Sequence, residues 1–344
     1  MQIKPIAGNL SMIMKNDKKL KVAMIGLGKI AWAYEKDPLV SASDDFPTHF
    51  RVLSKHPNFH LAAAQDKNAQ ARKEFSSHAK KSGLDPKMYE NWEALIASER
   101  PDLLVVASNT DSHYEICDRA IDSGVKNILC EKPISYSLKE AVKLVKKAEK
   151  NNCELYVNYT RAFNPSYSEL VEKIRNGFLG KIQSFDVKYV RGIINNGTHA
   201  LDLLIRMLGE VKSAEAVKAA GQKMTFPDTT VSAAVQFKNG TGGYLHGLSS
   251  EFYGIFELEI LGELGRIIIT GDKSRIYMRQ DGKRGVLREV HGGENLINTK
   301  IGHYPIYDAI YSCIASGDNR KNKCSGRDAL RSLKVADMIV KSSK

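Results

Sequence analysis

The chain has 344 residues, 42% hydrophobic and 26% charged, which is the ordinary composition of a soluble globular protein long enough for two domains. No stretch is apolar enough to span a membrane, and the first twenty residues lack the sustained apolar core of a signal peptide. The 51 basic and 39 acidic residues leave a net charge of +12, but no aromatic residues interleave with lysine and arginine as in an RNA-binding sheet, so the charge favours small anionic ligands over nucleic acid.

The first recognisable element follows a loose arm over residues 1–19. Its apolar run, Val22 to Ile25, has the length of a strand buried on both faces, and it ends at Gly26, Leu27 and Gly28. Gly26 suits a tight turn, and Gly28 lets backbone N–H groups of a following helix approach a pyrophosphate. The pattern GLGKIA therefore predicts a dinucleotide site, although glycine-rich turns also end ordinary strands.

An acidic residue marks the end of the second predicted strand. Residues 32–47 are polar and broken by prolines, and we expect them to form a loop inserted before a helix near 48–54. Phe59 to Gln65 is the next strand, and Asp66 at its tip can accept hydrogen bonds from the adenosine ribose hydroxyls and repel a 2′-phosphate. NAD is therefore favoured over NADP, with Lys67 beside Asp66 able to weaken that preference.

Strands and helices then alternate up to about residue 157. We predict helices near 69–82, 91–98 and 113–123 and strands over 103–107, 127–130 and 155–159, which together indicate a doubly wound parallel sheet. In such sheets ligands lie beyond the carboxyl ends of the strands. The predicted cofactor-binding residues are Gly26, Gly28, Lys29, Ile30, Asp66, Ser108, Asn109, Thr110, His113, Glu131 and Lys132.

Five segments together carry a family resemblance: GLGKIA, SNTDSH, CEKP, NNGTHALDLL and LGELGRIIITG. In this order they resemble the Gfo/Idh/MocA oxidoreductases, the glucose-fructose oxidoreductase and inositol dehydrogenase family. The resemblance implies an N-terminal Rossmann domain and a C-terminal α+β domain with a large open, mostly antiparallel sheet. We place the dinucleotide-binding domain at 20–154 and the substrate-binding and oligomerisation domain at 155–344. The implied activity is hydride exchange between a nicotinamide and a sugar or cyclitol.

Two residues are predicted to be catalytic. Oxidation of a secondary alcohol needs a group that takes the hydroxyl proton, and Lys132 at a strand end can stabilise the developing alkoxide or relay that proton. The resemblance gives the lysine of EKP this role; a surface lysine in a turn is the alternative. His199 begins a helix, where the dipole favours a neutral imidazole that titrates near pH 7. A packed core histidine is the alternative for His199.

One position departs from the family pattern. The family usually has an aspartate four residues before the histidine, whereas this chain has Asn195, whose amide can bind substrate but cannot relay a proton. Asp202, three residues after His199, shares its helix face and can orient the imidazole or cap a neighbouring segment. We predict that Asn195, His199 and Asp202 bind substrate.

The stretch YTRAFNP supplies two further candidates. The resemblance places Tyr159 and Arg161 near the substrate, and arginine suits a phosphate or carboxylate as a bidentate partner. An interdomain ion pair is an equally good explanation of Arg161. We predict a sugar or nucleotide-sugar substrate; a cyclitol dehydrogenase, a keto-sugar reductase and a non-catalytic NAD-binding regulatory protein are the alternatives.

The remainder has the alternating pattern of strands. We expect strands over 231–237, 243–248, 256–261, 266–270 and 275–278, with Asn239 and Gly240 as a hairpin turn, and closing helices near 303–316 and 325–341 that pack near the cofactor domain. The family suggests a homo-oligomer, dimer or tetramer, through this sheet. His246 and Tyr253 lie on it, where packing is a better explanation than substrate contact.

The five cysteines are widely spaced and form no CxxC pair, which fits reduced thiols in a cytoplasmic protein better than disulfides or a zinc site. The histidine, aspartate and cysteine positions indicate no metal site. The cysteines are Cys117, Cys130, Cys153, Cys313 and Cys324.

Overall fold

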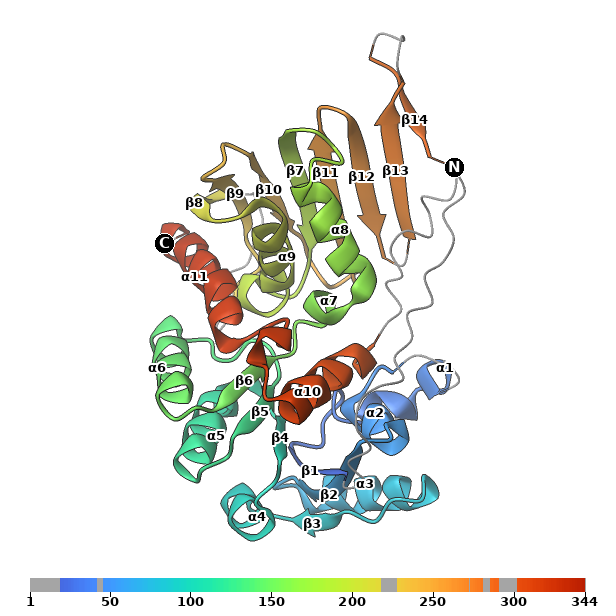
Figure 1. Cartoon of the computed structure of the whole chain (residues 1–344), viewed down its shortest axis with the longest axis vertical. Coiled ribbons are helices and arrows are strands. Elements are labelled where there is room, and N and C mark those ends of the chain that lie inside the picture. Colours follow the sequence, from blue (N-terminus) through green and yellow to red (C-terminus); the bar gives the residue numbers. More distant parts are fainter. Residues whose placement is uncertain are drawn as a thin grey trace.

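A computed structural model describes residues 19–41, 46–217, 228–271, 273–280, 285–290 and 302–343, and it contains two sheets, one in each half of the molecule (Figure 1). The expected N-terminal arm, apart from residue 19, lies outside the described residues. Among the described helices, none combines the length and apolarity needed to cross a membrane. All five cysteines are buried with free thiols.

The first sheet is parallel throughout and has the strand order β3-β2-β1-β4-β5-β6. This is the Rossmann arrangement, with the change of winding direction between β1 and β4. The fold class predicted from the sequence is confirmed. The strands are β1 Leu20–Ile25, β2 Phe59–Gln65, β3 Lys87–Tyr89, β4 Leu103–Val106, β5 Asn127–Cys130 and β6 Glu154–Val157.

The helices of this half follow from their caps and apolar faces. Asn68 and Ser137 accept hydrogen bonds from the first backbone N–H groups of α3 and α6, which satisfies donors that a helix end leaves unpaired. The sheet continues through β6, three residues beyond the expected limit at residue 154. The helices are α3 Ala69–Lys81, α4 Trp92–Glu99, α5 Thr110–Asp122 and α6 Leu138–Lys150.

The first helix of the Rossmann unit is interrupted by an excursion. A helical turn begins at Gly28, and the chain then leaves through the 3-10 turn Ala33–Lys36 and the short α1, Pro38–Ser41. It returns in α2, His49–Lys55, whose first N–H groups donate to the carbonyls of Ile30 at 3.2 Å and Ala31 at 2.9 Å. Helix α2 thus continues the turn opened at Gly28. The insertion expected at 32–47 is present, but its described part forms a 3-10 turn and a short helix instead of a loop, and residues 42–45 lie outside the described residues. The insertion explains the long spacing from Gly28 to Asp66.

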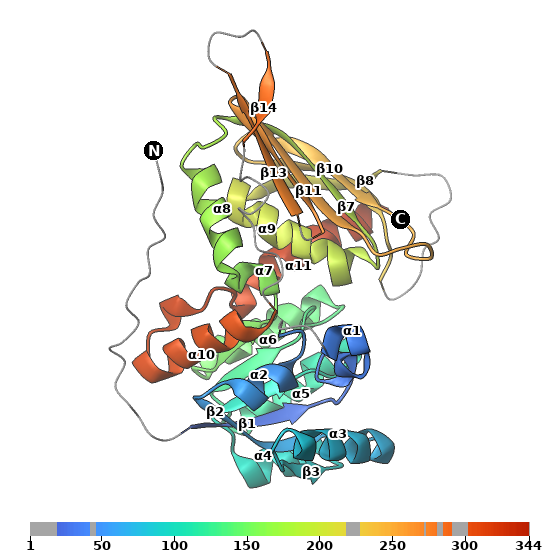
Figure 2. The ribbon, with the colours of Figure 1, turned by 90° about the vertical axis from the view of Figure 1, so that its right-hand side faces the viewer.

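The second sheet has the order β14-β13-β12-β11-β7-β10-β9-β8 and is antiparallel except for the β7–β10 pair. Helices α8, Pro165–Arg175, α9, Thr198–Leu208, and α11, Gly326–Ser342, cover one face (Figure 2). The strands are β7 Ile182–Tyr189, β8 Val211–Val217, β9 Ser232–Phe237, β10 Gly242–Gly247, β11 Phe256–Gly262, β12 Gly265–Thr270, β13 Lys273–Arg279 and β14 Leu287–Glu289.

The sequence analysis missed the strand β7, although it lies in the middle of this sheet. Its inward residues Phe185, Val187 and Tyr189 are fully buried and alternate with polar residues, so the period-two signal was present. It also missed β3, β8, β14 and the helix α8. The first and last of these strands have only three residues each, too few for a pattern to be distinguished from a loop.

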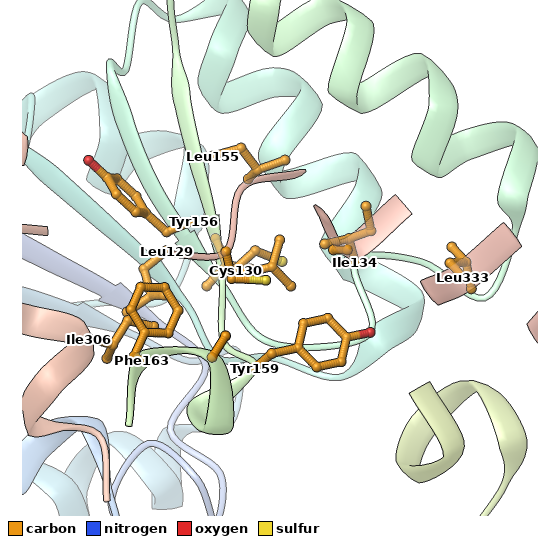
Figure 3. Packing of buried hydrophobic residues seen from close by; sticks show 14 of the residues in the cluster. Leu129, Cys130, Ile134, Leu155, Tyr156, Tyr159, Phe163, Ile306 and Leu333 are labelled. Atoms are coloured by element: carbon orange, nitrogen blue, oxygen red, sulfur yellow. The ribbon is translucent and has the colours of Figure 1, made fainter. Parts of the chain in front are cut away.

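The chain returns to the first half at its end, as the sequence predicted. In α10, Tyr304–Ser316, the Tyr307 ring packs edge-on against Phe59 of β2, and Asp308 lies 3.1 Å from His56. Before α11, the N–H of Val157 donates to the carbonyl of Cys324 at 3.0 Å. Side chains of β5, β6, α7 (Thr160–Phe163), α10 and α11 share one apolar cluster (Figure 3). This shared core joins the two sheets.

Candidate functional site

The glycine turn after β1 meets the end of β4. Gly26 has a φ of +88°, and a Cβ there would lie 2.6 Å from the Cα of Ser108, so any larger residue would collide with backbone. At Gly28 a Cβ would meet nothing within 4 Å. The first glycine is thus required by packing inside the protein, whereas the second borders open space in which a ligand can lie.

Unpaired donors surround that space. Within the described residues, the N–H groups of Gly28, Lys29 and Ile30 donate to no acceptor, as expected for the first turn of a helix. Asp66 lies beside them and accepts hydrogen bonds from the N–H of Leu27 at 2.9 Å and of Asn68 at 2.8 Å. An open glycine, free N–H groups and an adjacent carboxylate fit the pyrophosphate and ribose of a dinucleotide.

The loops after β4 and β5 are tied together by His113. Its Nδ1 lies 2.8 Å from the carbonyl oxygen of Pro133 and its Nε2 lies 3.0 Å from that of Ser108. The ring is buried, so His113 links the two loops from within the protein interior. Asn109 and Thr110 open α5 at the same edge of the sheet. The segments that carry the predicted cofactor-binding residues, which follow β1, β2, β4 and β5, therefore lie at one edge of the sheet.

Glu131 is the centre of a buried polar cluster. Its Oε1 accepts hydrogen bonds from Nε2 of His49 at 2.9 Å and from the amide of Asn158, while Nδ1 of His49 lies 2.9 Å from the hydroxyl of Tyr307. Burial acts to raise the pKa of Glu131, but the hydrogen bond and charge of His49 outweigh it and lower this pKa to about 2. Glu131 is therefore ionised at neutral pH.

Two acceptors next to this carboxylate have no donor among the described residues. Nδ1 of His303 lies 3.1 Å from the carbonyl of Phe46, which leaves Nε2 as the acceptor, buried and 4.0 Å from Glu131. Burial, reinforced by His49, lowers the pKa of His303 to about 4, so its ring is neutral at pH 7. Oδ1 of Asn158 is also buried and unpaired. Ligand hydroxyl groups, such as those of a ribose, would supply the missing donors.

His49, Glu131 and His303 are also residue types that bind metals, and their ligand atoms lie within 4.8 Å of one another. The sequence analysis, which expected no metal constellation, missed this group because its members are far apart in the chain. Hydrogen bonds account for the observed position of Glu131, since Oε1 already accepts two N–H donors.

The side chain of Lys132 reaches from the end of β5 to the second domain. Its Nζ donates to Oδ1 of Asn195 at 2.6 Å and to the carbonyl of Asn195 at 3.1 Å. Burial lowers the pKa of Lys132, and Arg161 and Arg191 lower it further, whereas Glu131 and Asp228 raise it. The EKP lysine and position 195 are therefore in contact, although 63 residues of chain separate them.

His199 lies in the first turn of α9, beside this pair. Burial is the main cause of a pKa well below the usual value, and the charges of Lys132 and Arg161 add to it. The imidazole is therefore neutral at pH 7, as the helix-dipole argument predicted. The same argument also predicted titration near pH 7, and this part is wrong because burial lowers the pKa well below that range. Its Nδ1 is buried without a partner among the described residues.

Arg161 presents a guanidinium without an acidic partner. It stacks on the ring of Phe256, 3.7 Å from the centroid, and forms no ion pair or hydrogen bond with any described residue. The interdomain ion pair considered from the sequence is therefore absent from the described part of the chain. A stacked guanidinium keeps its N–H donors free for an anion.

Two predicted substrate residues point elsewhere. Tyr159 is only 2% exposed and lies within the apolar cluster (Figure 3). Its hydroxyl faces Ser332 of α11, and its ring packs edge-on against His199. Asp202 is buried, and both of its carboxylate oxygens bond Arg206 on the next turn, at 2.7 and 3.0 Å. Tyr159 thus supports His199 from the core, and Asp202 is occupied in an ion pair.

The sequence analysis also missed Asp228. Its two carboxylate oxygens accept the N–H groups of Ile194 at 2.8 Å and Asn195 at 2.7 Å, so it holds the turn that carries the partner of Lys132. It follows the undescribed residues 218–227, and no motif marks it. The only available signal was Gly192, whose Cβ would lie 1.9 Å from the Asp228 carboxylate.

Comparisons with known proteins agree with this architecture. Residues 20–159 match an oxidoreductase family described by its NAD-binding Rossmann fold, and residues 192–344 match the C-terminal alpha/beta domain of the same family. A myo-inositol 2-dehydrogenase of Thermotoga maritima is 27% identical over 223 residues, which are 58% of this chain and 66% of that protein. The chain therefore matches just under two thirds of that relative.

Solved structures resemble the whole described fold. The WlbA dehydrogenase of Bordetella pertussis, in complex with NADH and UDP-GlcNAcA, aligns with a TM-score of 0.75 and 20% identity over 95% of this chain and 96% of its own. A mutant 3-ketoreductase of Actinomadura kijaniata, in complex with TDP-benzene and NADP, aligns with a TM-score of 0.70 and 19% identity over 94% and 98%. At these identities the likeness concerns the fold.

The two glycines provide a test of the cofactor site. Gly26→Ala would force a Cβ into the Ser108 backbone at a positive φ, and we expect the free energy of unfolding to fall by about 1–3 kcal/mol. Gly28→Ala should leave the unfolding curve unchanged and weaken NADH binding, because its methyl group occupies only ligand space. Urea titration and NADH fluorescence measure the two effects. Unchanged NADH affinity in Gly28→Ala would contradict this position for the pyrophosphate.

Proposed function

This chain belongs to the Gfo/Idh/MocA family of oxidoreductases, and from that premise we propose that it transfers hydride between a nicotinamide cofactor and a secondary hydroxyl or keto group of a sugar or nucleotide sugar. The observation that carries the proposal is the convergence of Lys132, Asn195 and His199 at the end of β5, next to the Glu131 cluster. A bound nicotinamide supplies the redox chemistry in this family, and the residues Gly28 to Ile30, Asp66 and Glu131 would hold its dinucleotide.

Lys132 is suited to stabilise the reacting oxygen. An ammonium has three N–H donors, and two of them are used on Asn195, so the third is available for a substrate oxygen. A positive charge there stabilises a developing alkoxide, and its lowered pKa eases proton transfer. His199 is neutral beside it before reaction, so its imidazole can accept the hydroxyl proton during oxidation and becomes an imidazolium in doing so.

The free guanidinium of Arg161 supports an anionic substrate. Its positive charge lowers the pKa of both Lys132 and His199, which shows that it lies near them. Its N–H donors are unused within the described residues. A phosphate or carboxylate would bind it in a bidentate manner. This favours a phosphorylated or nucleotide-linked sugar over a neutral one. The Thermotoga relative keeps a cyclitol substrate as the second candidate.

Turnover by Lys132→Ala tests the reaction. With a panel of nucleotide-linked sugars, free sugars and cyclitols, we expect loss of on the order of 100-fold or more in kcat, with the Kd for NADH within about threefold of wild type. Lys126→Ala, which removes a lysine at the opposite end of β5, is the control. It should keep the wild-type kcat and the wild-type Kd for NADH. NADH formation is followed by its fluorescence.

Each outcome of that panel separates the candidates. Binding of NADH without turnover of any compound would reject an enzyme in favour of a regulatory NAD-binding protein, which Asn195 keeps as the alternative. Equal kcat/KM for a free sugar and its nucleotide-linked form would reject the role given to Arg161. A higher kcat/KM for myo-inositol than for any sugar would identify the chain as a cyclitol dehydrogenase.

Cofactor preference is proposed to be for NAD, with Asp66 as its determinant. A carboxylate beside the glycine turn accepts ribose hydroxyls and repels a 2′-phosphate. Asp66→Ala should lower the ratio of the NADP Kd to the NAD Kd by about tenfold. Asp102→Ala is the control, because Asp102 accepts the N–H of Lys21 at the opposite end of β1. Tighter binding of NADP than of NAD by the wild type would overturn the proposal.

We also propose that a second copy of the chain covers the face of the large sheet that carries no helix (Figure 2). Tyr244 is 52% exposed there, next to the hydrogen bond between His246 and Asp186 at 2.9 Å. Sedimentation velocity should detect a dimer or tetramer, and Tyr244→Asp should shift it to smaller species. Tyr34→Asp, an exposed tyrosine in the other half, should not. A wild-type monomer at micromolar concentration would contradict this.

A further inference from the structure

A partly buried ammonium is stabilised by a nearby negative charge, and Asn195 does not supply one to Lys132. Both contacts from Lys132 to position 195 are to neutral oxygens. An amine that leaves water without a counter-charge is strongly destabilised in its ionised form. The charged side chains that act on Lys132 are Glu131 directly after β5, Arg161 on α7, Asp228 before β9, and Arg191 before the π-helical turn Ile193–Gly197. Two of these four are cations that oppose its charge.

Of the two carboxylates, Glu131 raises the pKa of Lys132 more than Asp228 does, but Glu131 is already hydrogen-bonded within the other cluster. Its Oε1 accepts hydrogen bonds from His49 and Asn158, and this hydrogen-bonded cluster extends to Tyr307. Asp228 has no competing cation: among the described residues its oxygens accept only backbone N–H groups. Burial raises the pKa of Asp228, whereas the N–H groups of Ile194 and Asn195 and the charge of Lys132 lower it; Asp228 in turn raises the pKa of Lys132.

The segment 228–230 also fixes where Asn195 lies. Gly192 donates to Oγ1 of Thr230 at 2.8 Å, Ile193 to the carbonyl of Thr229 at 2.9 Å, and Ile194 and Asn195 to the two oxygens of Asp228. Four consecutive N–H groups are thus held by three consecutive residues. The turn needs this support, because Arg191 and Gly192 both have positive φ angles, +64° and +84°.

A carboxylate fits at this position only because of Gly192. Any side chain there would collide with the Asp228 oxygens, at 1.9 Å for a Cβ. Asp228 is also largely buried, so water screens its charge poorly. One of its oxygens accepts the backbone N–H of Asn195, the same residue whose carbonyl and Oδ1 accept hydrogen bonds from Lys132.

We propose that Asp228 is a positioning residue for the reaction: it holds Asn195 against Lys132 and supplies, from a separate segment of the chain, the buried negative charge that the amide at position 195 lacks. This rests on the proposed function for its consequence in turnover, but not for its effect on the lysine. The arrangement divides between two residues what one aspartate at position 195 would do, since Asn195 makes the contact and Asp228 carries the charge.

The test measures the proton affinity of Lys132 without any turnover. The full-length protein is labelled with acetic anhydride over a range of pH, and acetylation of the Lys132 peptide is followed by mass spectrometry, with and without NADH. Asp228→Asn removes the negative charge, which destabilises the ammonium, so the apparent pKa of Lys132 should fall by about one unit. Adding Asn195→Asp to that variant should raise it again to the wild-type value or above.

Two controls separate charge from structural support. Thr230→Val removes the hydrogen bond from Gly192 to the segment 228–230 but removes no charge, so it should leave the labelling midpoint of Lys132 unchanged. Asp328→Asn removes another partly buried carboxylate that accepts a backbone N–H, at the start of α11, and should also leave it unchanged. If Asp228→Asn does not fold, Asp228→Ser, whose hydroxyl still accepts one N–H, takes its place.

Turnover provides the second measurement. Asp228→Asn should lower kcat by on the order of tenfold. In the pH–rate profile, the limb that reports Lys132 should shift by the same amount as the labelling midpoint. Adding Asn195→Asp should reverse both effects. An unshifted midpoint in Asp228→Asn, an equal shift in Asp328→Asn, or no recovery in the double variant would overturn the proposal. A wild type that turns over no sugar would reject the function alone, because the labelling result stands independently.

Discussion

The burial of the Lys132 ammonium between two domains is the constraint that the rest of the site has to satisfy. A charge taken out of water needs acceptors and a counter-charge. The acceptors come from Asn195, on a turn of the second domain, and the carboxylates from the end of β5 and the segment before β9. No single element holds all of them. The site therefore exists only when the Rossmann sheet and the large sheet are docked together.

That docking is built into the order of the chain. The last two helices return to the first half, where Tyr307 reaches both Phe59 and His49, and Cys324 pairs with the strand β6. The buried cluster around Glu131 thus contains residues from α2, β5, the segment after β6 and α10. Its hydrogen bonds stabilise the edge of the sheet at which the cofactor residues end. The same contacts that join the domains therefore also shape the cofactor side of the site.

Local patterns predicted much of this arrangement and failed in identifiable places. The glycine turn, Asp66, Lys132 and Asn195 were found because each follows a strand end or a short motif, and the structure brings them to one edge. Tyr159 was assigned to substrate by the family resemblance, and Asp202 because it follows His199 on the same predicted helix face. Their side chains instead face Ser332 and Arg206, since the helix face on which a residue lies depends on what packs against it. Asp228 and His303 lie in no motif and were missed.

The sequence by itself determined the order and type of most elements, the parallel first sheet and the segments that end at its carboxyl edge. These follow from periods of two and 3.6 residues and from glycine and proline positions, which are properties of neighbouring residues. Only the tertiary structure decided which charges face Lys132, that His199 is neutral through burial, and that α2 resumes a helix opened at Gly28. The physical reason is that electrostatics and burial depend on distance in space, and Lys132 and Asp228 are brought together by two sheets rather than by the chain between them.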